Sequence, residues 1–222
     1  IPAKTPPAAT LKIALGTLYN HPNVGPFIGR QLIRRLVTSN PSRAYVATVA
    51  AKFNDNCSGV RGGMKAVIRA ILMQPEAAQM SNTSGKLREP ILRVTAYLRA
   101  FGATSTSGKF AALNTSNPGT ALGQSPMDSP SVFNFYRPGY VPPGTLASAA
   151  GMVVPEMQIT HETSVAGYVN YMYDLVQYGF GRAPSDSPRD VQPNFSAELA
   201  QTDDPAALVA RGPQARPLRR RP

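Results

Sequence analysis

The chain lacks the residues from which disulfides, most metal sites and membrane spans are made. Its 222 residues include no Trp, two His and a single Cys, Cys57. One cysteine excludes a disulfide within the chain, but it assigns no compartment, because many exported bacterial proteins have no disulfide. No apolar run approaches the roughly 18–20 residues of a membrane-spanning helix. The sequence therefore predicts no transmembrane segment.

Complete catalytic and metal-binding motifs are also missing. His21, His161 and Cys57 lie in three different segments, whereas structural zinc needs four Cys or His ligands and catalytic zinc needs three protein ligands. Residues 102–109 resemble a phosphate-binding loop, but five residues instead of four separate the glycines, and Phe110 replaces the magnesium-binding Ser or Thr. No Gly-x-Ser-x-Gly motif is present. The sequence predicts no metal site and no catalytic residue, and it identifies no cofactor.

Positive charge is plentiful but concentrated at one end. The formal net charge is +11, and five arginines lie in the last twelve residues. Residues 1–204 hold 18 basic and 12 acidic residues, a net charge of +6. A nucleic-acid interface combines basic with aromatic side chains, and no aromatic residue follows Phe195. We expect no specific nucleic-acid binding, and we expect residues 206–222 to form a disordered basic tail.

Helical periodicity dominates the remaining sequence. Apolar residues recur at a spacing typical of amphipathic helices, and alternating strand patterns are scarce. The expected helices span residues 10–19, 24–37, 41–54, 62–73, 86–101 and 158–179. Residues 103–154 show no such pattern and are rich in Ser, Thr, Gly and Pro. The sequence predicts an all-α, irregular multi-helix domain over residues 1–205, with one long Pro/Gly/aromatic loop.

The segment 129–144 is the most distinctive part of that loop. It contains four aromatic residues, four prolines and two glycines, so it cannot be a helix and is too aromatic for an ordinary solvated linker. In a structural interpretation, its aromatic side chains, Phe133 among them, fill gaps between helices and Arg137 caps helix carbonyls. In a functional interpretation, Asn134, Tyr136 and Arg137 form a stiff platform for a sugar or a peptide. Both interpretations stay open.

A second candidate site lies on the helix expected from residue 24. Arg30 and Arg34 are one turn apart, on a face away from the apolar stripe. Two guanidinium groups so placed can hold a carboxylate, sulfate or phosphate, and His21 precedes the same helix. The alternative is a solvated basic face, or arginines that pair with carboxylates elsewhere in the fold.

Three long blocks, residues 21–42, 129–144 and 158–172, together resemble the C-terminal part of a large bacterial family. That family is catalogued as domain of unknown function 1800. The resemblance implies a mostly helical protein exported to the periplasm or the extracellular space, here as a fragment without its signal peptide. It also implies a partner, a co-encoded exported sulfatase-like protein. Family members continue into another apolar helix after residues 203–209, whereas the sequence of this chain becomes rich in Arg and Pro. This difference is explained either by a native basic tail or by a frameshift.

Two functional hypotheses follow. The first is a cell-envelope binding or interaction module that uses residues 134–140 and the face of Arg30 and Arg34. The second is part of a hydrolase of envelope polymers, whose catalytic residues lie in the missing N-terminal portion. In that case Arg30, Arg34 and His21 would orient the substrate.

Overall fold

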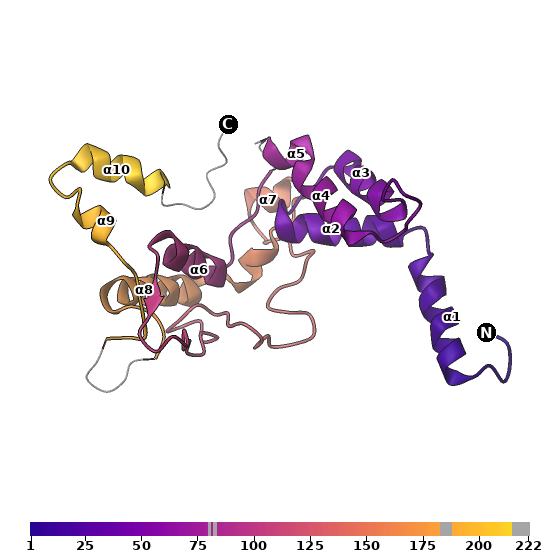
Figure 1. Ribbon diagram of the computed structural model, residues 1–222, viewed down its shortest axis with the longest axis horizontal. Coiled ribbons are helices and arrows are strands. Elements are labelled where there is room, and N and C mark those ends of the chain that lie inside the picture. The colour runs from indigo at the N-terminus through magenta and orange to yellow at the C-terminus, as the bar shows by residue number, and fades with distance from the viewer. Residues whose placement is uncertain (80, 82–83, 183–187, 215–222) are drawn as a thin grey trace. The chain divides into compact units, whose positions relative to one another are not determined.

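A computed structural model describes residues 1–79, 81, 84–182 and 188–214 (Figure 1). Helices dominate them, and the strands found among these residues are β1, Thr104–Ser105, and β2, Val191–Gln192. The prediction of a mostly helical fold is confirmed. The chain divides into unit 1, Ile1–Lys86 with Pro143–Val154, and unit 2, Leu87–Pro142 with Pro155–Pro222. Residues 1–205, expected to belong to one domain, are distributed over both units.

Unit 1 is built from helices alone in the part that the structure describes. They are α1 Pro7–Tyr19, α2 Val24–Leu36, α3 Arg43–Asn54, α4 Met64–Met73, α5 Pro75–Ala78 and α7 Leu146–Ala149. Ser42 begins α3 as a side-chain cap, because its hydroxyl accepts a hydrogen bond from the Tyr45 N–H at 3.0 Å. Proline at the first position begins α5, where a missing N–H breaks no helical hydrogen bond.

Two glycines bring α2 and α3 close together. A Cβ at Gly25 would lie 3.0 Å from the Asn54 side-chain oxygen, and a Cβ at Gly29 would lie 3.1 Å from a Val49 methyl carbon. The hydrophobic core of unit 1 forms around this contact. Its buried members are Ile33, Tyr45, Val46, Val49, Phe53, Val67, Ile71 and Ala77.

The fully buried stripe of α2 is made of small residues as well as a large one. Gly25, Gly29 and Ile33 are buried, whereas Phe27 is 61% exposed and Leu36 is 50% exposed. Residues four apart share a face of a helix, so the two glycines and Ile33 define the contact stripe. Phe27 and Leu36 lie away from this stripe, because the close backbone approach at the two glycines sets which face of α2 packs against α3.

Unit 2 combines helices with the short antiparallel pair β1–β2. Its elements are α6 Pro90–Ala100, β1, the 3-10 helix η1 Pro155–Ile159, α8 Glu162–Tyr178, β2, α9 Ser196–Leu199 and α10 Pro205–Gln214. Thr104 pairs with Gln192, and Ser105 pairs with Val191. The buried core comprises Val94, Leu122, Leu175, Phe180 and Val191. The loop segment around Leu122 therefore contributes to the same core as α6 and α8.

The helix α10 occupies the start of the expected tail. Asp204 begins it, because its Oδ1 accepts hydrogen bonds from the Ala206 and Ala207 N–H groups, each at 3.0 Å. The structure therefore differs from the expectation of disorder for residues 206–214, which are helical. The rest of the expected tail, residues 215–222, lies outside the described residues.

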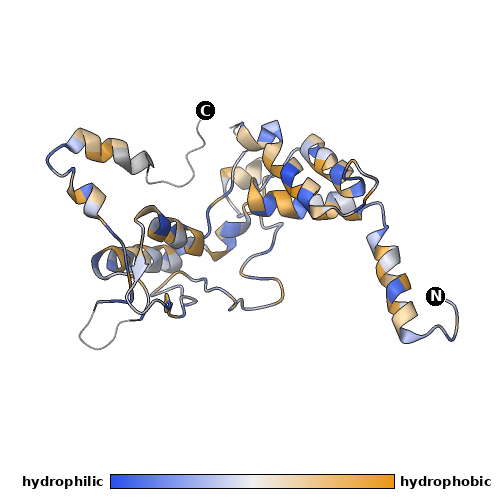
Figure 2. Cartoon of the chain, viewed as in Figure 1, coloured by the Kyte–Doolittle hydropathy of each residue, from blue (hydrophilic) through white to orange (hydrophobic). Residues whose placement is uncertain are grey.

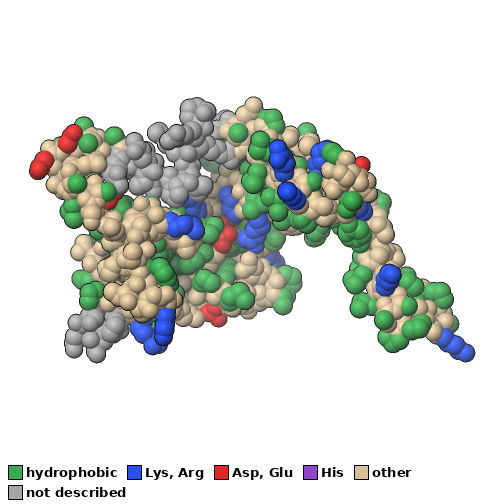
Figure 3. Space-filling view, in the orientation of Figure 1, with side chains coloured by type: hydrophobic (Ala, Val, Ile, Leu, Met, Phe, Trp, Pro, Cys, Tyr) green, Lys and Arg blue, Asp and Glu red, His purple; other side chains and the backbone are tan. Residues whose placement is uncertain are grey.

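Several helices carry apolar side chains on exposed faces. No residue of α1 is buried, and its apolar residues lie all along the helix (Figure 2). In unit 1, hydrophobic side chains on the surface are interspersed with Lys and Arg over α3 and α4 (Figure 3). None of the helices in the described ranges is both long enough and apolar enough to cross a membrane.

Candidate functional site

The loop of residues 127–137 in unit 2, here called the aromatic loop, is fixed at its start by Asp128. The Asp128 carboxylate accepts hydrogen bonds from the Asn114 side-chain amide at 2.7 Å and from the Ser116 hydroxyl at 2.5 Å. Hydrogen bonds to the ionised form favour it. The bonds from Ser116 and then Asn114 therefore hold the pKa of Asp128 below its ordinary value.

Tyr136 fixes the other end of the aromatic loop. The side chain is 3% exposed, and its hydroxyl donates a hydrogen bond to the Glu89 carboxylate. Glu89 is the residue at the N-cap of α6, and its second oxygen accepts a hydrogen bond from the Gln124 side-chain amide at 2.5 Å. A buried phenol with a charged acceptor is well satisfied, so Tyr136 holds the loop to α6.

Asn134 and Arg137 lie beside Tyr136 but are exposed. The Arg137 N–H donates to the Gln158 side-chain oxygen at 2.7 Å. Asn134 has a φ of 69°, a left-handed conformation that Asn tolerates better than most residues, and its N–H closes a turn with the Ser131 carbonyl at 3.0 Å. The structure thus brings Asn134, Tyr136 and Arg137 together in one loop, with only Tyr136 buried.

Between its two fixed ends, the aromatic loop exposes large apolar side chains. Val132 is 95% exposed, Met127 is fully exposed, and Phe133 is 66% exposed. Phe133 therefore does not fill a gap between helices, as the structural interpretation of the segment required. The cause is local: a turn closed by Ser131 and Asn134 directs this part of the chain outward. An ordered loop with exposed apolar side chains is typical of an interaction surface.

The remaining sequence candidates lie in unit 1. Arg30 is exposed on α2, and Arg34, one turn later, is half-buried. Burial, and then repulsion from Arg30, lowers the pKa of Arg34. His21 contacts a different residue: its carbonyl accepts a hydrogen bond from the Arg61 guanidinium at 3.2 Å. The ring of His21 accepts from the Asn23 N–H at 3.2 Å.

In the described part of the chain, no three His, Cys, Asp or Glu side chains gather closely enough to hold an ion. Cys57 lies exposed in the turn after α3. His161 is the N-cap of α8: its ring nitrogen accepts from the Ser164 N–H at 3.4 Å, while the Ser164 hydroxyl accepts from the His161 N–H at 2.9 Å. This reciprocal cap explains the residue type at this position.

Sequence reasoning missed Asp190, which organises the loop that resembled a phosphate-binding loop. The donors to its carboxylate oxygens are the N–H groups of Ser107 and Ala111, both at 2.9 Å, and the hydroxyls of Ser105 at 2.9 Å and Thr106 at 3.3 Å. These bonds, led by the two backbone donors, hold the pKa of Asp190 well below its usual range. The loop of residues 105–111 therefore binds a carboxylate of its own chain. No sequence pattern links residue 190 to this loop.

The family model described as "Protein of unknown function (DUF1800)" matches residues 2–214. The match includes α10, which the resemblance of the three sequence blocks did not reach. No curated protein matches the chain, and no solved structure matches it.

Proposed function

We propose a binding function for this chain, which belongs to the DUF1800 family of proteins of unknown function. The aromatic loop is the surface that we assign to this function. The observation that carries the proposal is the contrast within the loop, where Tyr136 is 3% exposed and Val132 is 95% exposed. A loop that is held at both ends by side-chain hydrogen bonds and exposes apolar side chains loses little conformational entropy when it binds.

The proposed location is the bacterial cell envelope, after export to the periplasm or the extracellular space. The proposed partner is a second exported protein, the sulfatase-like product of a neighbouring gene. Both follow from the family resemblance of the sequence blocks. Apolar side chains in the centre of an interface and charges at its edge are the usual arrangement between proteins, and the exposed Arg137 lies beside the apolar part of the loop.

Replacing Val132 and Phe133 together by Ser is expected to weaken binding of the purified partner by about tenfold or more, because central apolar contacts dominate interface energies. Calorimetric titration of the partner would measure the change. The fold is expected to persist, because both side chains are largely exposed.

Leu199→Ser is the matched control, since Leu199 in α9 has the same exposed fraction as Phe133, 66%. It should leave the affinity unchanged. Equal affinities of wild type and the loop variant, or an equal loss in the Leu199 variant, would remove the aromatic loop as the contact surface.

The arginine pair on α2 is proposed to contact acidic groups of the same partner. Arg30→Ala is expected to weaken binding by about threefold to tenfold at low salt and by less at high salt, because exposed charges are screened. Arg69→Ala, on the exposed side of α4, is the control. If the affinity for the partner did not depend on salt and was the same in the Arg30→Ala variant, a contact between this arginine and acidic groups of the partner would be excluded.

A further inference from the structure

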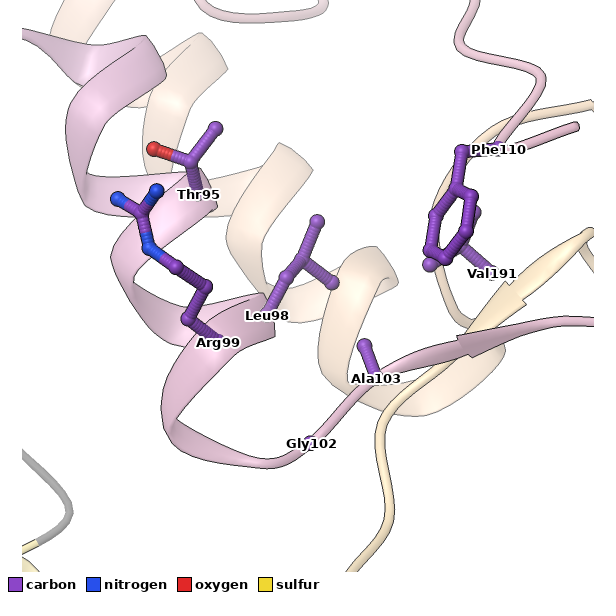
Figure 4. Close-up of a pocket in the computed structure, with 7 residues that line it drawn as sticks. All are labelled: Thr95, Leu98, Arg99, Gly102, Ala103, Phe110 and Val191. Carbon is purple, nitrogen blue, oxygen red and sulfur yellow. The ribbon is translucent and has the colours of Figure 1, made fainter.

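An open cleft lies in unit 2, between α6 and the loop of residues 105–111. Its volume is about 440 Å³, and its lining comprises Thr95, Leu98, Arg99, Gly102, Ala103, Phe110 and Val191. Figure 4 shows Thr95, Leu98 and Arg99 on α6, with Phe110 across the cleft from them. The volume lies within the range of roughly 300–1,000 Å³ that is typical of small-molecule sites.

The base of the cleft is apolar and packs against the core of unit 2. Val191 is 1% exposed and belongs to the core of unit 2, against which Leu98 and Ala103 also pack. Val191 is held in β2, where it pairs with Ser105 of β1. An apolar ligand placed here would cover surface that continues the hydrophobic core, which is favourable in proportion to the area removed from water.

One side of the cleft is polar. Thr95 and Arg99 are one helical turn apart on α6, so their side chains share a face, and Figure 4 shows them next to each other. Arg99 is exposed, and its guanidinium has no hydrogen bond or ion pair with any residue that the structure describes. The only carboxylate next to Val191 along the chain, Asp190, accepts its hydrogen bonds from the loop of residues 105–111. The positive charge of Arg99 at the cleft is therefore not paired with the carboxylate of Asp190.

Phe110 is the unusual residue of this cleft. Its φ is 50°, in the left-handed region, and its ring is 57% exposed. A bulky residue rarely adopts this conformation, and strained residues of this kind persist where the surroundings impose them, often at binding sites. Here the hydrogen bonds to Asp190 fix the conformation of the loop of residues 105–111. The Phe110 N–H itself donates to the Ser105 hydroxyl at 3.1 Å. The fold holds an aromatic ring at the side of the cleft opposite α6, although folding gains little from burying this ring.

We propose that this cleft binds a small amphipathic carboxylate. The apolar body of the ligand lies on Leu98, Ala103 and Val191 and contacts the ring of Phe110. The carboxylate accepts hydrogen bonds from the guanidinium of Arg99, with the Thr95 hydroxyl beside it. This ligand site is separate from the aromatic loop and does not depend on the partner protein proposed above.

The test uses 4-phenylbutyrate as the probe and its neutral analogue 4-phenylbutanol as the comparison, each titrated into the full chain and followed by backbone amide chemical shifts. The acid is expected to give saturable shifts at residues 98–103, 110 and 191 and to bind more tightly than the alcohol. Arg99→Gln is expected to weaken binding of the acid by about fivefold or more, and to leave binding of the alcohol unchanged, since a charge-assisted bond is lost. Absence of saturable shifts, or equal affinities of acid and alcohol, would overturn the proposal.

A second pair of variants separates binding from folding. Phe110→Gly removes the ring and relieves the left-handed backbone, so it is expected to abolish saturable binding of 4-phenylbutyrate without lowering the melting temperature. Lys4→Gly is the matched control, because Lys4 has a φ of 63° and is exposed but does not line the cleft. It should preserve both stability and binding. If the Phe110→Gly variant bound 4-phenylbutyrate as tightly as wild type, the assignment of the ligand to this cleft would be wrong.

Discussion

Replacing Gly167 by Ala is expected to destabilise unit 2 by about 2 kcal/mol. Ala normally stabilises a helix interior by about 1 kcal/mol relative to Gly. Gly167, however, is buried in α8, where a Cβ would overlap the Pro118 carbonyl oxygen and lie 2.8 Å from the Gly119 carbonyl carbon. Both are backbone atoms that cannot rotate away, and overpacking of this kind costs about 1–3 kcal/mol or more. Thermal unfolding followed by circular dichroism would measure the loss as a fall of roughly 5 °C.

Gly16→Ala provides the opposite expectation in the same chain. Gly16 lies inside α1, and a Cβ there would meet no atom within 4 Å. The substitution should therefore raise helix stability by about 0.5–1 kcal/mol. If both substitutions stabilised the protein, the close contact between α8 and the segment at Pro118 would be wrong.

Asp190→Asn is expected to lower the melting temperature by several degrees at neutral pH. The asparagine would place an NH2 group where Asp190 Oδ2 accepts from the Ala111 N–H at 2.9 Å, so this donor would face another donor. The pKa of Asp190 is lower in the folded state than in the unfolded state. The contribution of the ionised Asp190 side chain to folding stability is therefore fully present above the unfolded pKa of about 4, and it is lost as the pH falls through the folded pKa. The difference between wild type and variant should therefore shrink as the pH is lowered below about 4.

The measurement is a series of thermal unfolding curves between neutral and acidic pH. Asp174→Asn is the control, because Asp174 is half-exposed and lies 3.9 Å from Arg189, a geometry that contributes little to stability. A constant difference between wild type and the Asp190 variant across the pH range would contradict the assigned role of the carboxylate.

The sequence predicted the six long helices because each has an apolar period and clear end signals. Pro90 begins α6, at a position where the missing N–H of proline breaks no helical hydrogen bond. Periodicity failed where backbone contact replaced side-chain packing, as at Gly25 and Gly29 of α2. It also failed for α10, whose start signal was present as Asp204 followed by Pro205, but was obscured by the Arg- and Pro-rich residues that follow.

The candidate site was predictable only in part, because its fixing contacts join residues far apart in the sequence. The composition of the segment 129–144 correctly indicated an ordered loop, and Tyr136 is indeed buried. Which side chains point outward depends on Glu89, 47 residues away from Tyr136, and on the turn at Asn134. No local pattern carries that information, so the exposure of Phe133 emerged only from the structure.

The hydrogen bond between Ser105 and Asp190 spans 85 residues of chain. A ribosome adds about 5–20 residues per second, so the segment 105–111 waits for roughly 4–17 s after its own synthesis before its acceptor exists. A chain shortened to end before residue 190 would keep every residue of this segment but would lack the carboxylate that accepts from the Ser107 and Ala111 N–H groups. The folding of unit 2 is therefore completed late in biosynthesis. Strand β1 is synthesised first and must stay unpaired until β2 has been made.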